Sequence, residues 1–121
     1  MSNLIRVAMT QTKNAYAAMP HSVAELPSIE GRLGDIRNVN IEHHVELLHD
    51  AKAQGVRLIC FGELFTGPYF ALGREPFWKG LAEDALTGPT VTRFKAEAAA
   101  AQMIVIAPIY ELDPSGKRFN T

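Results

Sequence analysis

Three short apolar runs most constrain the fold of this 121-residue chain. They cover residues 4–11, 56–62 and 103–110, and each is rich in branched or aromatic side chains. The runs are close to continuous rather than strictly alternating, which is typical of strands that are covered on both faces. We therefore expect three buried strands in a sheet whose two faces are both packed.

Helical patterns separate the three runs. In residues 36–54, apolar side chains recur at helical spacing from Ile41 onward, and Gly55 follows where a left-handed C-terminal cap is expected. Residues 89–102 show a second helical pattern, and they begin with Pro89, a residue type favoured in the first turn of a helix. The order β-α-β-α-β predicts an α/β fold with helices packed on a parallel sheet.

Two long stretches do not fit this regular alternation. Residues 12–35 contain two prolines and two glycines, and we expect a surface loop there. Residues 64–87 hold five of the ten aromatic side chains of the chain. Long ordered loops in compact domains often carry function, so the second stretch is the first place to look for a site.

Glu63 stands at the junction between the second apolar run and the aromatic stretch. Ligands of α/β sheets gather at the carboxyl ends of strands, so the fold would deliver this carboxylate to a functional position. Neighbouring rings such as Phe61 and Phe65 would remove water from it, and a desolvated carboxylate is a better proton acceptor near neutral pH. From the residues alone an alternative stays equally open, in which Glu63 caps a nearby amide or pairs with an arginine.

The charge balance and the length of the apolar segments limit the class of protein. Twelve basic and 13 acidic residues give a formal charge of −1, which does not provide the basic surface of a nucleic-acid or anionic-membrane binder. The longest apolar run, residues 103–110, is far short of the about 20 residues of a membrane span. A single cysteine, Cys60, and the lack of an apolar leader favour a cytoplasmic protein. We expect no nucleic-acid partner and no membrane association.

Several motifs resemble those of the nitrilase superfamily of carbon–nitrogen hydrolases. The segment Leu58-Ile59-Cys60-Phe61-Gly62-Glu63 matches the superfamily's apolar strand that ends in a catalytic glutamate, with glycine where many members have proline. The superfamily resemblance runs through residues 5–11, 57–70 and 103–111. A finer similarity, to the β-ureidopropionase branch of N-carbamoyl-β-alanine amidohydrolases, lies in residues 74–78, 82–83, 88–90, 108–111 and 119–121. Residues 12–35 lie outside the resemblance and look like an extra or variable loop.

The resemblance implies a four-layer α-β-β-α sandwich in which two sheets pack face to face. Residues 1–121 would be the N-terminal portion of that domain only, because three strands and two helices supply part of it. A portion of this kind would expose an apolar sheet face larger than a monomer tolerates. We therefore expect the 121-residue chain to associate, and we expect the complete protein to be a homo-oligomer, as is usual in the family.

The resemblance also implies a Glu–Lys–Cys catalytic set that works without a cofactor. In the family, the glutamate is the general base for the cysteine thiol, the thiol attacks the carbon of the C–N bond, and the lysine stabilises the oxyanion. Only Glu63 carries over to this sequence, because the lysine and cysteine motifs of the family would follow Thr121. We therefore expect the 121-residue chain alone to be inactive.

The other reactive side chains match no part of that set. Cys60 lies three residues before Glu63, so a strand would place the two on opposite faces, and we expect Cys60 to be a core residue. The five lysines are expected on the surface. The spacing of His43, His44 and His49 does not bring their rings to one helix face, so we expect surface or interface histidines and no metal.

The favoured function is hydrolysis of a small N-carbamoyl amine or amide, with Phe65, Tyr69 and Phe70 lining or gating the pocket beside Glu63. Two alternatives stay open. One is a different enzyme of the same superfamily: a carbamoylputrescine amidase, an aliphatic amidase or a nitrilase. The other is a non-catalytic α/β module that pairs with another chain.

Overall fold

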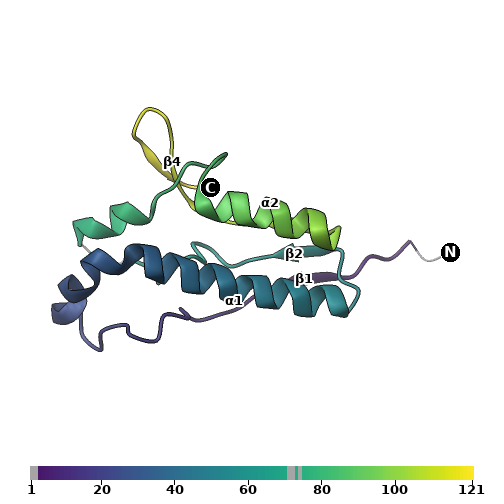
Figure 1. Cartoon of the computed structure of the whole chain (residues 1–121), viewed down its shortest axis with the longest axis horizontal. Coiled ribbons are helices and arrows are strands. Elements are labelled where there is room, and N and C mark those ends of the chain that lie inside the picture. Colours follow the sequence, from purple (N-terminus) through teal and green to yellow (C-terminus); the bar gives the residue numbers. More distant parts are fainter. Residues whose placement is uncertain (1–2, 71–72, 74) are drawn as a thin grey trace.

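A parallel three-stranded sheet with two helices on one face forms the centre of the fold (Figure 1). The computed structural model describes residues 3–70, 73 and 75–121. The order of the central elements is β1 (Val7–Met9), α1 (Leu33–Ala53), β2 (Leu58–Cys60), α2 (Pro89–Ala101) and β3 (Ile104–Ile106). This order confirms the predicted α/β class. No helix in the described ranges is long and apolar enough to cross a membrane.

The strands of the sheet are all parallel and lie in the order β1-β2-β3. Ala8 pairs with Ile59, and Ile59 pairs with Val105, so these three side chains share one face of the sheet. Two predicted helix signals are confirmed. Gly55 follows α1 with a positive φ of 75°, and Pro89 occupies the first turn of α2.

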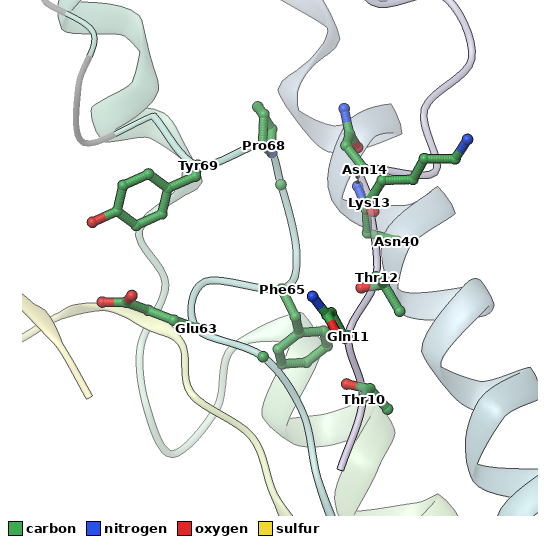
Figure 2. A pocket seen from close by; sticks show the side chains of 12 residues that line it. Thr10, Gln11, Thr12, Lys13, Asn14, Asn40, Glu63, Phe65, Pro68 and Tyr69 are labelled. Atoms are coloured by element: carbon green, nitrogen blue, oxygen red, sulfur yellow. Dashed lines mark hydrogen bonds between the residues drawn. The ribbon is translucent and has the colours of Figure 1, made fainter.

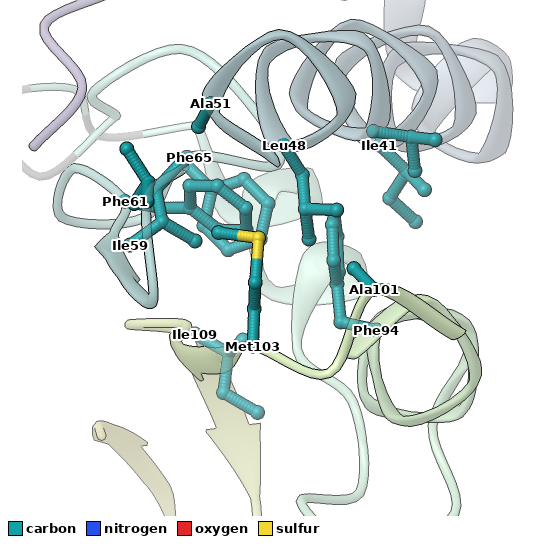
Figure 3. Packing of buried hydrophobic residues seen from close by; sticks show 12 residues of the cluster. Ile41, Leu48, Ala51, Ile59, Phe61, Phe65, Phe94, Ala101, Met103 and Ile109 are labelled. Atoms are coloured by element: carbon teal, nitrogen blue, oxygen red, sulfur yellow. The ribbon is translucent and has the colours of Figure 1, made fainter. Parts of the chain in front are cut away.

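The core lies between this face of the sheet and the two helices (Figure 3). Both helices turn an apolar stripe toward the strands, made of Ile41, Val45, Leu48, Ala51, Phe94 and Ala101. At its centre, Phe61, Phe65 and Phe94 form an aromatic cluster with ring centroids 4.8 to 5.6 Å apart in tilted and edge-to-face arrangements. Such pairs add to the burial of apolar area, so the cluster holds α2 and the segment after β2 together.

The outer face of the same sheet carries apolar side chains that the described part of the chain leaves uncovered. Val7 and Met9 on β1 and Ile104 and Ile106 on β3 are all exposed, with Met9 at 84% and Ile104 at 61%. The prediction that both sheet faces are packed is therefore wrong, because α1 and α2 lie on the same face. The expectation of an exposed apolar sheet face is confirmed.

Two 3-10 helices occupy stretches that the sequence predicts as loops. The first, η1 (Val23–Arg32), lies within residues 12–35, and the second, η2 (Pro76–Leu81), lies in the aromatic stretch. Both contact α1 and lie near its N-terminal end (Figure 1). Together with Ile36 of α1, they form a second small core that contains Ile29, Trp78 and Leu81. Sequence periodicity missed η1 and η2 because 3-10 turns do not repeat at 3.6 residues.

The end of the third apolar run also differs from the prediction. β3 ends at Ile106 rather than at Tyr110, because Pro108 has no N–H to donate to a ladder. The chain then forms an antiparallel hairpin of β4 (Tyr110–Leu112) and β5 (Arg118–Asn120). The sequence analysis did not predict this hairpin.

Buried Glu83 connects α2 to α1. Its carboxylate accepts hydrogen bonds from the backbone N–H of Thr90 at 2.8 Å and from the Thr90 hydroxyl at 2.7 Å, and it lies 3.3 Å from Nε of Arg37 on α1. A carboxylate is favoured at a helix N-terminus, where backbone N–H groups are unpaired. Gly88 leaves room for this contact, since a Cβ there would lie 2.8 Å from Glu83 Oε1. Residues 82–83 and 88–90, which carry the finer resemblance, thus have a structural role.

The uncovered sheet face predicts the solution state of the 121-residue chain. We expect the chain to associate at micromolar concentration and expect Met9→Glu or Ile104→Lys to shift it toward monomer, because each places a charge on the apolar outer face. Sedimentation velocity measures this change. Leu86→Glu is the matched control, because Leu86 is an equally exposed apolar residue outside the sheet. A monomeric wild-type chain with sharp thermal unfolding would contradict the expectation.

Candidate active site

The backbone pairing of the sheet continues to the edge where Glu63 lies. Thr10 N donates to Cys60 O at 3.0 Å, and Phe61 N donates to Ile106 O at 3.0 Å, both just beyond the regular strands. Glu63 therefore follows directly from the carboxyl end of the central strand, with the end of β1 beside it. This is the edge at which α/β sheets bind ligands.

A tight turn orients the side chains around Glu63. Leu64 has a φ of 51°, in the left-handed region that is unfavourable for a residue with a Cβ, and Gly67 N donates to Leu64 O at 3.2 Å. The Glu63 and Phe65 side chains leave this turn in different directions (Figure 2). Phe65 enters the core and Glu63 faces outward. Backbone strain of this kind is concentrated at functional sites, where the surrounding packing maintains it.

The Glu63 turn forms one wall of a pocket of about 470 Å³ (Figure 2). Residues 10–14, which follow β1, form the opposite wall, and Asn40 on α1 contributes to the lining. Of the three predicted substrate contacts, Phe65 and Tyr69 line this pocket with Glu63. Phe70 lies apart from it and lines a neighbouring cavity. The structure therefore brings together three of the four residues that the sequence proposes for one site.

The surroundings of Glu63 differ from the expectation of a carboxylate enclosed by aromatic rings. The side chain is exposed, because Phe61 and Phe65 turn into the core on the helix side of the sheet. Its partner is the side-chain amide of Asn120 on β5, which donates to Glu63 Oε1. The carboxylate is thus held by a neutral donor from an element that the sequence analysis did not predict.

Asn40 and His44 form a buried polar pair beneath the pocket. The amide of Asn40 accepts from Ala15 N at 2.9 Å and donates to Asn14 Oδ1 at 2.7 Å and to Ile36 O at 2.8 Å. The bonds to Ala15 and Asn14 attach the end of the wall at residues 10–14 to α1, and the bond to Ile36 O lies within that helix. The sequence analysis missed Asn40, although a lone asparagine on the apolar stripe of a helix is a signal for a buried hydrogen-bond network.

His44 corrects the expectation of a surface histidine. It is fully buried, with its ring centroid 5.0 Å from that of Phe61 and 4.6 Å from that of Phe65. Nδ1 donates to the carbonyl oxygen of Asn40 at 2.8 Å, which leaves Nε2 to accept from the Thr12 hydroxyl at 3.4 Å. Burial lowers the pKa of His44 below its ordinary value, and the nearby His43 lowers it further, while the bond to Asn40 acts in the opposite direction.

The sequence of the chain was compared with models of known protein families. The model of the carbon–nitrogen hydrolase family matches residues 35–121, more than two thirds of the chain. The chain belongs to the carbon–nitrogen hydrolase family. This membership supports the resemblance to the nitrilase superfamily. The class of reaction that it indicates is hydrolysis of C–N bonds in small molecules.

The family match covers the two walls of the pocket unequally. It includes the Glu63 turn and Asn40, whereas residues 10–14 precede it together with the whole of β1 and η1. One wall of the pocket in this carbon–nitrogen hydrolase therefore lies within the family match, and the other lies in the segment before it.

The remaining reactive side chains lie as follows in this carbon–nitrogen hydrolase. Cys60 is half-buried on the uncovered sheet face, with Sγ 3.5 Å from Phe61 O, so the expectation of a core residue is wrong because that face is not packed. All five lysines are exposed, as predicted, and Lys13 lines the Glu63 pocket. His49 pairs with Glu97 at 2.9 Å. The described residues bring no three His, Cys, Asp or Glu side chains into a metal-binding group.

Burial of neutral His44 predicts a pH-dependent stability. The pKa of His44 is lowered in the folded chain, so the unfolded chain binds a proton first as the pH falls below about 6.5. The free energy of unfolding should therefore decrease on acidification, by at most about 1.4 kcal/mol per pH unit for this proton.

The pH dependence can be assigned by urea unfolding between pH 8 and 5. We expect His44→Gln to give a shallower slope than the wild type below pH 6.5, whereas His21→Gln, at an exposed histidine, should keep the wild-type slope. Groups such as Glu97 contribute equally to all three proteins. Equal slopes for His44→Gln and wild type would contradict the argument.

Asn40 should be important for the stability of the pocket wall. Asn40→Ala removes three hydrogen bonds and leaves the part-buried Ala15 N and Asn14 Oδ1 without their partner on α1, so we expect a loss of about 2–3 kcal/mol in the free energy of unfolding. Urea unfolding measures it. Asn38→Ala, at an exposed asparagine of the same helix, should change stability by less than about 0.5 kcal/mol. A similar result for the two variants would be evidence against the network.

Proposed function

We propose that this protein hydrolyses small N-carbamoyl amines, with Glu63 as the general base, as the β-ureidopropionase-like motifs imply. The observation that carries the proposal is the position of Glu63. It is an exposed carboxylate at the carboxyl end of the central strand, in a pocket, within the segment that matches the carbon–nitrogen hydrolase family. A carboxylate that lines a pocket can accept a proton from a thiol and from water that enter it, as the two halves of the reaction require.

The proposed reaction has two stages. Glu63 takes the proton of a cysteine thiol as the sulfur attacks the carbamoyl carbon, and a lysine stabilises the oxyanion. The amine leaves with a proton, and a thioester-type intermediate remains on the cysteine. Glu63 then takes a proton from water as the water attacks this intermediate, which frees the thiol and a carbamate that decomposes to carbon dioxide and ammonia. No cofactor enters the scheme.

The lysine and cysteine of this scheme are proposed to come from outside residues 1–121. Cys60 is a poor nucleophile candidate, because it lies on β2 with its side chain on the open sheet face rather than in the Glu63 pocket. We therefore regard residues 1–121 as the N-terminal portion of the domain. The uncovered apolar sheet face supports this view, since the second sheet of a four-layer sandwich would cover it.

Asn120 and the aromatic residues have distinct proposed roles. The Asn120 amide orients the Glu63 carboxylate without adding a charge. Phe65 and Tyr69 border the reacting group, because they share its pocket, whereas Phe70 contacts a more distant part of the substrate in the adjoining cavity. The complete enzyme is proposed to be a cytoplasmic homo-oligomer.

The alternative functions differ in the compounds that the protein would hydrolyse. A carbamoylputrescine amidase, an aliphatic amidase or a nitrilase would use the same base, and turnover of N-carbamoyl-β-alanine, N-carbamoylputrescine and simple amides separates them. A non-catalytic module would use the open sheet face to pair with another chain and would turn over none of these compounds.

Glu63→Gln tests the proposed base in the protein that carries the complete catalytic set. We expect turnover of N-carbamoyl amines to fall about 10²- to 10⁴-fold, because the amide cannot accept the thiol proton. Stability should change by less than about 0.5 kcal/mol, since Glu63 is exposed.

Glu46→Gln provides the matched control for this experiment. Glu46 is an exposed glutamate on α1 outside the Glu63 pocket, and its variant should keep wild-type activity. Near-normal turnover by Glu63→Gln would remove Glu63 from the mechanism.

A further inference from the structure

A second cavity of about 460 Å³ adjoins the Glu63 pocket. Pro68 and Tyr69 line both spaces, so they form the boundary between them. Tyr69 is 57% exposed. Because Pro68 and Tyr69 border both spaces, a single ligand held at Glu63 can extend past the Tyr69 ring into the second cavity.

The second cavity has a mostly apolar lining from two parts of the chain. Met19, Val23 and Leu26 come from η1 and the residues before it. Phe70 and Trp78 face them from the aromatic stretch, with ring centroids 5.9 Å apart and an angle of 17° between the ring planes. These stacked rings and aliphatic side chains suit a flexible hydrocarbon chain or a flat ring.

A carboxylate also contributes to this cavity. Glu75 is among its lining residues, and the described lining contains no lysine, arginine or histidine. A substituent that ends in a carboxylate would therefore lose its hydration in this cavity without gaining a cationic partner from those residues. The β-ureidopropionase branch, to which the sequence is similar, acts on a chain of that anionic kind. The cavity of this protein has the opposite character.

We infer that the second cavity is the specificity subsite for an apolar substituent on the amine nitrogen of the substrate. The inference rests on the proposed function and narrows its substrate class. The N-carbamoyl group is common to the substrates of the proposed function, so the substituent on the amine nitrogen is what a subsite can distinguish. The shared boundary at Pro68 and Tyr69 lets one molecule fill both spaces.

The subsite also explains what the segment before the family match contributes. Met19, Val23 and Leu26 all precede residue 35, where the match begins, whereas Tyr69 and Trp78 lie within it. The aromatic wall of the second cavity therefore lies within the family match, and its aliphatic wall lies before the match.

The test measures binding rather than turnover. Trp78, the only tryptophan among residues 1–121, lines the cavity, so a ligand that enters should change its fluorescence. The probes are methylurea, butylurea and N-carbamoyl-β-alanine, titrated into the complete protein and its Glu63→Gln variant. A Trp78→Phe variant identifies the part of the signal that comes from Trp78.

We expect affinity to rise about fourfold for each methylene between methylurea and butylurea, as each enters the cavity. Butylurea should change the Trp78 signal and bind more tightly than N-carbamoyl-β-alanine. Equal dissociation constants for methylurea and butylurea, or tighter binding of N-carbamoyl-β-alanine, would overturn the inference. The order of affinities is read independently of whether Glu63→Gln abolishes turnover, so the subsite and the catalytic base can fail separately.

A charge placed in the cavity gives the second arm of the test. Val23→Glu should raise the dissociation constant of butylurea at least tenfold and leave that of methylurea unchanged. Val23 is 73% exposed, so the new charge stays compatible with folding. Val39→Glu, at an exposed valine of α1 outside both spaces, is the control and should change neither constant.

An uncharged variant covers the case in which Val23→Glu does not fold. Met19→Gln should then weaken butylurea binding about tenfold, because a polar amide replaces an apolar lining residue. Unchanged butylurea affinity in the folded variant would show that the cavity does not bind the substituent.

Discussion

The packing of α1 and α2 against a single face of the β1-β2-β3 sheet is the interaction on which the rest of the structure depends. Ile59 at the centre of the sheet is almost fully buried beneath the helices, beside the cluster of Phe61, Phe65 and Phe94. Packing of these rings holds the segment after β2 against the core. Glu63 lies in the same segment but stays outside the core, because the left-handed turn at Leu64 separates it from Phe65. The position of the carboxylate therefore follows from the packing of its neighbours.

Buried polar groups complete the arrangement on the helix side. Asn40 holds the wall at residues 14–15, His44 contacts Thr12, and Glu83 caps α2 through Thr90 while lying close to Arg37. Such groups are costly to bury without partners, so each one specifies which segments must lie together. They attach residues 12–15, which precede α1, to that helix. The pocket wall that includes Thr12 and Asn14 is therefore positioned by α1.

The two adjoining cavities have different proposed roles: one holds the reacting group and the other binds the substituent. The Glu63 pocket combines polar side chains with a carboxylate at a strand end, as proton transfer requires. The second cavity, across Pro68 and Tyr69, combines aliphatic and aromatic side chains that recognise shape and apolar area. A substrate with a reactive C–N group and an apolar substituent would use both. The stacked Phe70 and Trp78 rings line the second cavity and also pack in the second small core around η1 and η2.

The sequence by itself determined the parallel α/β arrangement, the helix signals at Gly55 and Pro89, and the position of Glu63 after the central strand, because local signals and short apolar runs carry that information. Only the tertiary structure decided which sheet face is covered, since a continuous apolar run does not say on which side the helices lie. It also decided the burial of His44, the exposure of Glu63 and its contact with Asn120. Those outcomes depend on residues 32 to 57 positions apart in the chain meeting in space, which no local pattern records.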